Sequence, residues 1–223
     1  MRKKEQAEKA LLEQKVLPLY YHDSAEVSIE ILRALYAGGV RILEYTNRGE
    51  SALENFELLR KIADKEMTDL QLGIGTIKTK KQAKKYIEAG ADFVVCPSIN
   101  EEVGEVVINE KLLWIPGCMT PTEIATAENA GAEIVKLFPG NLLGPSYITS
   151  IKDLFPNLRF VVTGGVEAEE SNLKAWFKSG VVGVGMGSKL VTKEVLANKD
   201  YEGLKKATAA ALHLARKASQ DSE

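Results

Sequence analysis

Cysteine and histidine are scarce in this chain of 223 residues, each occurring only twice. Cys96 and Cys118 are too few for a disulfide framework, and both stand near the expected ends of strands, which fits a reducing cytoplasm. His22 and His213 leave little for a zinc site, and His213 falls in the expected last helix. We therefore expect no metal site, no cofactor and a cytoplasmic location, although magnesium held by carboxylates alone stays open.

The chain also lacks an excess of one charge and any long apolar run. Its 29 lysines and arginines against 31 acidic residues imply no basic face, so we expect no nucleic-acid partner. No run approaches the roughly 18 apolar residues of a membrane span, and the charged N-terminus lacks a signal-peptide core. With 45% apolar residues, the chain has the composition of one large globular domain over residues 1–223. We expect no contact with a membrane.

Segments of strand length alternate with segments of helix length along the whole chain. Eight strands are expected, at 16–20, 40–46, 70–76, 92–96, 112–116, 133–138, 159–163 and 181–186. Helical segments separate them, among them 24–37, 51–66 and a last helix over roughly 201–217. Ser24 is a plausible N-cap for the first of these helices. The pattern predicts an α/β fold.

A weak internal repeat places glycine between a helix and the following strand. It occurs at Ala37-Gly38-Gly39-Val40, Ala89-Gly90-Ala91-Asp92, Ala130-Gly131-Ala132-Glu133 and Ser179-Gly180-Val181. Glycine there suits the left-handed residue that ends many helices, and strand–helix units of this length pair their strands in parallel. Eight units favour a closed (β/α)8 TIM barrel over the alternative, a doubly wound open sheet.

A charged amphipathic segment over about 3–14, within residues 1–15, precedes this pattern. We interpret it as an extra N-terminal helix. Its apolar stripe of Ala7, Ala10 and Leu11 would cover the open bottom of the barrel.

One lysine stands inside an otherwise apolar strand, Ile134-Val135-Lys136-Leu137-Phe138. A buried ammonium is costly, so such a lysine is usually paired or deprotonated, and a neutral amine forms Schiff bases with carbonyl substrates. Because side chains alternate across a strand, Lys136 and Glu44 can meet inside the barrel if their faces point inward. The pair is predicted to be catalytic, with a structural buried ion pair as the competing interpretation.

Glycine clusters follow the last two strands, at Gly164-Gly165 and Gly187-Ser188. In a barrel these two loops often bind phosphate through backbone N–H groups. The run 183–187 is not a dinucleotide fingerprint, because it stands at the last strand and lacks the expected acidic residue. These loops therefore favour a phosphorylated substrate without a nicotinamide cofactor.

Several short motifs together resemble a known family. They are Leu43-Glu44-Tyr45-Thr46-Asn47-Arg48, Gly73-x-Gly75-Thr76, Ile115-Pro116-Gly117, Thr120-Pro121-x-Glu123, Val135-Lys136-Leu137-Phe138-Pro139 and Thr163-Gly164-Gly165. In this order, over roughly residues 16–217, the chain resembles the class I 2-keto-3-deoxy-6-phosphogluconate (KDPG) aldolases, including those that also cleave 4-hydroxy-2-oxoglutarate (KHG). The resemblance implies a metal-independent lyase of the Entner–Doudoroff type, a homotrimer that releases pyruvate and an aldehyde.

The resemblance also implies a role for individual residues. Lys136 would be the Schiff-base lysine and Glu44 the acid and base. The substrate-binding residues would be Arg48 and Thr76 at the pyruvate carboxylate, Pro97 and Phe138 in the lining, and Thr163, Gly164, Gly165, Gly187 and Ser188 toward the phosphate.

The chain departs from this family after the first strand. Many members carry a basic residue there, near the phosphate end, whereas Tyr21 takes the aligned position here. This leaves the choice among 2-keto-4-hydroxy acids open, with or without a phosphate and of either C4 stereochemistry, so a 2-keto-3-deoxy-6-phosphogalactonate aldolase is an alternative. Two other functions are weighed against an aldolase: a sugar-phosphate isomerase or epimerase with Glu44 as base, and a sugar-acid binding protein without catalysis.

Overall fold

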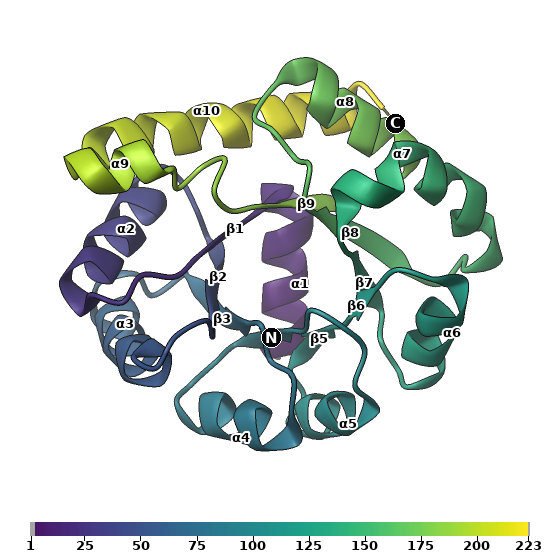
Figure 1. Ribbon diagram of the computed structural model, residues 1–223, viewed down its shortest axis with the longest axis horizontal. Helices are drawn as coiled ribbons and strands as arrows, with labels where there is room; N and C mark the ends of the chain where they lie inside the picture. Colours follow the sequence, from purple (N-terminus) through teal and green to yellow (C-terminus); the bar gives the residue numbers. More distant parts are fainter. Residues whose placement is uncertain (1–2, 223) are drawn as a thin grey trace.

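The strands form one parallel sheet that curls into a nearly closed barrel with helices outside it, as expected (Figure 1). The computed structural model describes residues 3–222; residues 1, 2 and 223, which the predicted domain bounds include, lie outside them. The strands are β1 (Val16–Tyr20), β2 (Ile42–Thr46), β3 (Gln71–Gly75), β4 (Phe93–Val95), β5 (Leu113–Ile115), β6 (Gly117–Cys118), β7 (Ile134–Leu137), β8 (Arg159–Thr163) and β9 (Gly183–Met186). Their order in the sheet is β5-β4-β3-β2-β1-β9-β8-β7-β6.

The expected fifth strand is broken in two, which gives nine strand segments in place of eight. Pro116 separates β5 from β6, because proline has no N–H to donate to a neighbouring strand. β5 pairs with β4, and β6 pairs with β7. The carbonyl of Pro116 still accepts the N–H of Lys136 at 2.8 Å, so the fifth strand joins the two ends of the sheet.

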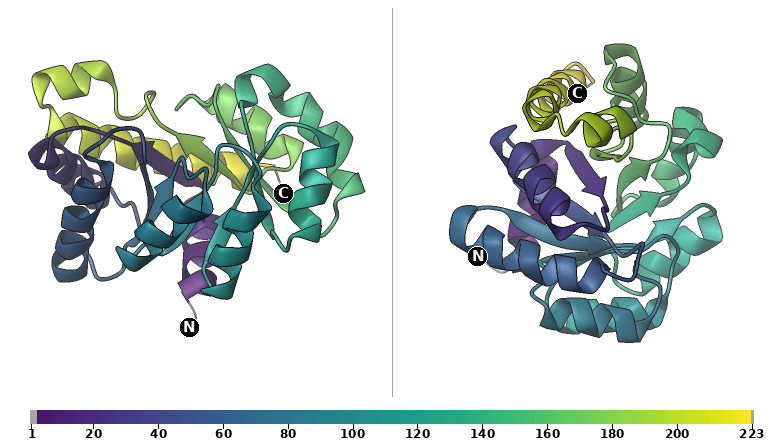
Figure 2. Two further views of the ribbon diagram at one scale, coloured as in Figure 1. Left: turned by 60° about the horizontal axis from the view of Figure 1, so that its bottom comes forward. Right: turned by 60° about the vertical axis from the view of Figure 1, so that its left-hand side comes forward.

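Most helices lie around the barrel between consecutive strands, whereas the first lies across one end of the barrel and the last two follow the final strand (Figures 1 and 2). They are α1 (Lys3–Gln14), α2 (Ala25–Ala37), α3 (Ala52–Glu66), α4 (Lys80–Glu88), α5 (Glu101–Asn109), α6 (Pro121–Asn129), α7 (Gly140–Ile151), η1 (Lys152–Leu154), α8 (Glu170–Ser179), α9 (Lys193–Asn198) and α10 (Tyr201–Gln220). Ser24 caps α2 as predicted, since its side chain accepts the N–H of Val27. The expected left-handed glycines are also confirmed, with positive φ at Gly39, Gly90, Gly131 and Gly180.

Two apolar clusters make up the core. The larger fills the space between the strands and the surrounding helices. The smaller consists of side chains from alternate strand positions together with residues of α1, and its buried members are Ala7, Leu11, Leu17, Ile42, Phe93, Val95, Leu113, Ile115, Ile134 and Val161. Because these strand residues point to the barrel axis, the lower part of the barrel is a packed core.

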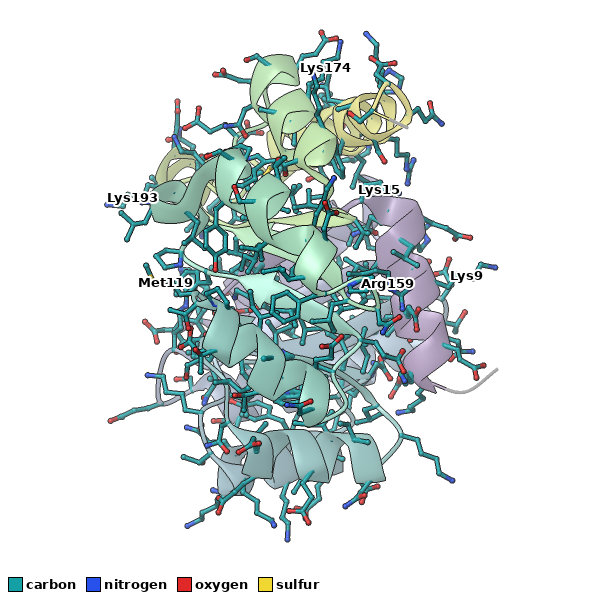
Figure 3. The ribbon with its side chains drawn as sticks, turned by 90° about the vertical axis from the view of Figure 1, so that its right-hand side faces the viewer. Lys9, Lys15, Met119, Arg159, Lys174 and Lys193 are labelled. Carbon is teal, nitrogen blue, oxygen red and sulfur yellow. The ribbon has the colours of Figure 1, made fainter. Side chains whose placement is uncertain are left out.

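Helix α1 covers the N-terminal end of the barrel, as its apolar stripe predicted. Ala7 and Leu11 are fully buried in the inner cluster, and Ala10 packs against it. At the end of the helix, the Gln14 amide donates to the carbonyls of Val16 at 2.6 Å and Ile42 at 2.8 Å. Figure 3 shows Lys9 pointing away from the barrel on the other side of the helix.

Removing the Leu11 side chain is expected to destabilise the fold. Leu11→Ala leaves a cavity in a packed core, which costs about 2–5 kcal/mol of unfolding free energy. Leu12→Ala, the same change on the partly exposed side of α1, should cost clearly less. Urea unfolding of both variants measures the difference, and equal losses would contradict the assigned role of α1 as a barrel cover.

None of the helices in residues 3–222 is long and apolar enough to cross a membrane.

Candidate active site

Lys136 lies in β7 with its side chain inside the barrel. It is only 6% exposed, above the inner apolar cluster to which its neighbour Ile134 belongs. Within residues 3–222 its amine makes neither a hydrogen bond nor an ion pair with another side chain. The amine lies over the ring of Phe138, 5.1 Å from the ring centroid. The amine is therefore buried without a counter-ion in contact, and it is left accessible to a carbonyl group that enters the barrel.

Glu44 lies in β2 and also faces the barrel interior. It is 1% exposed, and its Oε2 has no hydrogen-bond partner among the described residues. A Cβ added at Gly75 would lie 1.7 Å from its Oε1, so only glycine leaves room for this carboxylate. Burial raises the pKa of the Glu44 carboxyl above its ordinary value, although the positive charges of Lys136 and Arg48 act in the opposite direction.

The two groups both lie inside the barrel without forming an ion pair. Their charges act on each other, yet no amine–carboxylate contact within 4.0 Å joins Lys136 and Glu44 in the part of the chain that is described. The structural ion pair that competed with a catalytic pair therefore lacks its contact. Both groups are left available to a third molecule, since each is buried and incompletely paired.

Three of the predicted residues follow β2, β3 and β4. Arg48 is exposed, and no carboxylate of residues 3–222 pairs with it. Thr76 directly follows Gly75 and has φ +62°, a left-handed backbone that a β-branched residue rarely adopts. Pro97 is partly exposed, and its carbonyl lies against Gly117, where a Cβ would come within 2.4 Å of it. Strain of the Thr76 kind gathers at functional sites.

The predicted phosphate loops lie side by side, because β8 and β9 are neighbours in register. Thr163 pairs with Gly185, and its hydroxyl fills the space that a side chain at Gly185 would need. Gly164 and Gly165 have positive φ, and Gly165 packs against the backbone of Asn141. The backbone N–H groups of five residues find no acceptor within residues 3–222: Gly164, Gly165, Val166, Ser188 and Lys189.

One motif of the predicted family has a structural explanation. Thr120 and Glu123 form a capping box at the start of α6. Glu123 Oε2 accepts the N–H groups of Met119 at 2.9 Å and Thr120 at 2.8 Å. These bonds outweigh the effect of burial and lower the pKa of the Glu123 carboxyl. The capping box fixes the loop after β6, with Met119 at the edge of the molecule opposite α1 (Figure 3).

A polar network that the sequence did not predict supports the loops that follow β1 and β2. Asn55 donates to the carbonyls of His22 at 3.1 Å and Asp23 at 2.9 Å. The Tyr86 hydroxyl donates to the Asn47 side chain at 2.9 Å, next to Arg48. These partners are 32 to 39 residues apart in the chain, so no local motif reveals them. The network fixes the backbone that carries Arg48.

Cavities at the other end of the barrel lie beside α1. One, of about 390 Å³, is bounded by α1 and the start of β5 and includes Lys4, Glu8, Trp114 and Glu133. Lys4 and Glu133 pair at 2.6 Å within it. In residues 3–222, no three histidine, cysteine, aspartate or glutamate side chains are grouped as metal ligands would be. The candidate site therefore consists of the residues at the C-terminal ends of the strands.

Known proteins match this chain over most of its length. Residues 7–207 match the family described as KDPG and KHG aldolase. The chain is 33% identical over 193 residues to the 2-dehydro-3-deoxy-phosphogluconate aldolase of Treponema pallidum (strain Nichols), covering 86% of this chain and 89% of that protein. The 4-hydroxy-2-oxoglutarate and 2-dehydro-3-deoxyphosphogluconate aldolase from TTHB1 has a TM-score of 0.79 at 32% identity, covering 93% of this chain and 97% of that one.

A third relative is the KDPG aldolase of Legionella pneumophila, whose structure holds pyruvate captured as a covalent carbinolamine. It has a TM-score of 0.82 at 26% identity, and the match covers 91% of this chain and 96% of that one. Family, fold and length of match agree, and they favour the aldolase over the isomerase and the binding protein. The chain belongs to the KDPG and KHG aldolase family and is a carbon–carbon lyase.

Proposed function

We propose that this enzyme is a class I aldolase that cleaves 2-keto-4-hydroxy acids, KDPG and KHG among them, through a Schiff base on Lys136. The observation that carries the proposal is the buried Lys136 amine, which has no ionic partner among residues 3–222 and shares the barrel interior with a desolvated carboxylate. The covalent pyruvate of the Legionella relative supports it. The products are pyruvate and an aldehyde, glyceraldehyde 3-phosphate from KDPG or glyoxylate from KHG.

The reaction starts when the Lys136 amine adds to the C2 ketone. The carbinolamine then loses water and becomes an iminium, for which Glu44 moves the protons. The C3–C4 bond breaks, and its electron pair passes to the iminium and forms an enamine. Glu44 takes the proton of the C4 hydroxyl, so C4 leaves as an aldehyde. The enamine is protonated at C3, and water releases pyruvate and the free lysine.

Both ends of the substrate have polar groups to meet them. Arg48 holds the C1 carboxylate, where a guanidinium sets orientation as well as charge, and Thr76 assists. Phe138 and Pro97 form the apolar wall beside the reacting carbons. The far end of the substrate is received by Thr163, Gly164, Gly165, Gly187 and Ser188. N–H groups of these loops have no acceptor in the described part of the chain, and they suit phosphate oxygens.

We also propose that the enzyme is a cytoplasmic homotrimer of sugar-acid catabolism. Cys96 and Cys118 are buried free thiols, which fits a reducing compartment. Met119 and Leu142 expose 42% and 70% of their surface near the ends of β6 and β7, apolar area that a subunit contact would cover. Light scattering of the purified chain gives the mass, and a monomer at micromolar concentration would contradict the trimer.

The Schiff base is tested by trapping. Borohydride added with pyruvate should reduce the iminium and leave a stable pyruvyl group on Lys136, which peptide mass spectrometry locates. Without pyruvate, borohydride should leave the lysine unchanged. An unmodified Lys136 under conditions of full turnover would overturn the mechanism.

The substrate is identified with a panel of keto acids. Cleavage is followed by pyruvate release from KDPG, its C4 epimer 2-keto-3-deoxy-6-phosphogalactonate, their unphosphorylated forms, and KHG. We expect at least one phosphorylated member of the panel to be cleaved, with a kcat/KM higher than that of any unphosphorylated member. If no 2-keto-4-hydroxy acid is cleaved, the proposed function is wrong.

A further inference from the structure

The phosphate end of the site is poor in positive charge. Three loops follow the neighbouring strands β8, β9 and β1 at this end, at residues 164–169, 187–192 and 21–24. Lys189 is the single lysine or arginine in these loops, whereas Asp23, Glu167 and Glu169 carry carboxylates. A phosphate dianion placed here would be repelled by three acidic groups and attracted by one cation. Backbone N–H groups alone would have to overcome this balance.

Tyr21 does not change the charge at this end. Its hydroxyl donates to the Asp23 carboxylate, and burial together with this bond raises the pKa of Tyr21 to about 12, so it stays neutral. The side chain lies against Gly49, where an added Cβ would meet the hydroxyl. The loop after β1 therefore contributes hydrogen bonds and one negative charge.

Lys189 joins the two glycine loops. Its amine pairs with the Glu167 carboxylate at 2.5 Å, so that a residue beside Ser188 contacts a residue two positions after Gly165. Both side chains are accessible, with 60% of Lys189 and 38% of Glu167 exposed. An accessible pair is worth little on its own, because water competes for both charges. A doubly charged phosphate can therefore replace the single carboxylate as the partner of Lys189.

Glu167 is fixed more firmly than Lys189. Its N–H donates to the Asn172 side chain at 3.0 Å, and the Asn172 amide donates to the Gly165 carbonyl at 3.1 Å. The carboxylate thus stays with the loop after β8, while the long lysine side chain is free to turn from one acceptor to another. The movable partner of the pair is the lysine.

We propose that the Lys189 amine breaks its ion pair with Glu167 and binds the substrate phosphate instead. The Lys189–Glu167 pair would then determine the preference for phosphorylated substrates. The proposal rests on the proposed aldolase function and adds the phosphate ligand that this chain uses. The acceptor for Lys189 changes from a carboxylate to a phosphate oxygen, while the N–H groups of the glycine loops bind the other oxygens. No covalent bond is formed or broken.

The test is the ratio of kcat/KM for KDPG to kcat/KM for KHG, which carries no phosphate. In Lys189→Gln this ratio should fall about tenfold or more, through a higher KM for KDPG, as expected for one hydrogen bond to a charged group. In Glu167→Gln the ratio should rise a few fold, because the competing carboxylate is gone. The double variant should resemble Lys189→Gln.

Lys193→Gln is the matched control. Lys193 is an exposed lysine at the start of α9, four positions after Lys189, and has no ion pair within residues 3–222. This variant removes the same charge and should leave the ratio unchanged. Thermal unfolding of all four variants checks that the loops remain folded.

The outcomes separate this proposal from the aldolase function. If wild type cleaves neither substrate, the proposed function fails. If it cleaves both and Lys189→Gln leaves the ratio unaltered, or lowers both activities equally, Lys189 does not bind phosphate. A fall in the ratio for Glu167→Gln as large as for Lys189→Gln would also overturn the proposal. The ion pair would then only hold the two loops together.

Discussion

Lys136→Met is expected to abolish aldol cleavage, lowering kcat by at least about four orders of magnitude, as removal of a covalent nucleophile commonly does. Methionine has nearly the length of lysine and suits the apolar surroundings of β7. Since Lys136 makes no ion pair in the described structure, the variant should fold and melt at or above the wild-type temperature. Pyruvate release from the best substrate of the panel measures the loss, and borohydride trapping should yield no pyruvyl adduct.

Lys136→Arg separates a covalent role from a purely electrostatic one. Arginine keeps a positive charge at the same place but does not form a Schiff base with a ketone. We expect it to be as inactive as the methionine variant. Lys178→Met, a change at an exposed lysine of α8, should retain full activity. If the arginine variant kept kcat within tenfold of wild type, Lys136 would act through its charge, which would contradict the Schiff base.

Glu44→Gln should lower kcat by about two to four orders of magnitude, because it removes the group that transfers protons at C2 and C4. Glutamine has the same shape and fits the space that Gly75 leaves. In wild type, kcat/KM should rise with pH as Glu44 loses its proton, with an apparent pKa above the ordinary carboxyl value of about 4.3. This rise of kcat/KM at acid pH should be absent from the pH profile of Glu44→Gln.

The same substitution should affect stability in the opposite direction. Because burial raises the pKa of Glu44, the folded state binds this proton more tightly than the unfolded state does. Wild type therefore loses stability as the pH rises from the ordinary carboxyl pKa through the raised one, and the variant does not. At pH 7 Glu44→Gln should melt above wild type. A lower melting temperature together with full activity would contradict the assigned role of Glu44.

The fold was largely predictable, because its signals are local. Val16–Tyr20 is a strand over the predicted residues, since apolar side chains continue until the polar loop begins. The stripe of Ala7 and Leu11 indicated the cover of the barrel, since only one face of that helix is apolar. The break at Pro116 was not predicted, because a proline at a strand end and a proline that divides a strand look alike in sequence.

The site was predictable only in part, because its chemistry depends on distances across the barrel. Lys136 stands out in an apolar strand, but sequence cannot show whether a carboxylate lies within reach. Arg48 was visible after a strand, whereas the Tyr86–Asn47 contact that steadies its loop joins different units of the barrel. The Lys189–Glu167 pair was missed for the same reason, since each residue alone resembles a solvated charge.

The cover formed by α1 closes the N-terminal end of the barrel. Below Lys136 and Glu44, the apolar side chains of the inner cluster fill the barrel toward this end. Every proton that Glu44 exchanges with solvent must arrive from the same direction as the substrate and leave past the departing aldehyde. Hydrogen taken up at C3 of the enamine should therefore come from one face. A substrate that carries one tritium at C3 in a defined configuration should then yield, in deuterated water, pyruvate whose CHDT methyl group has a single handedness.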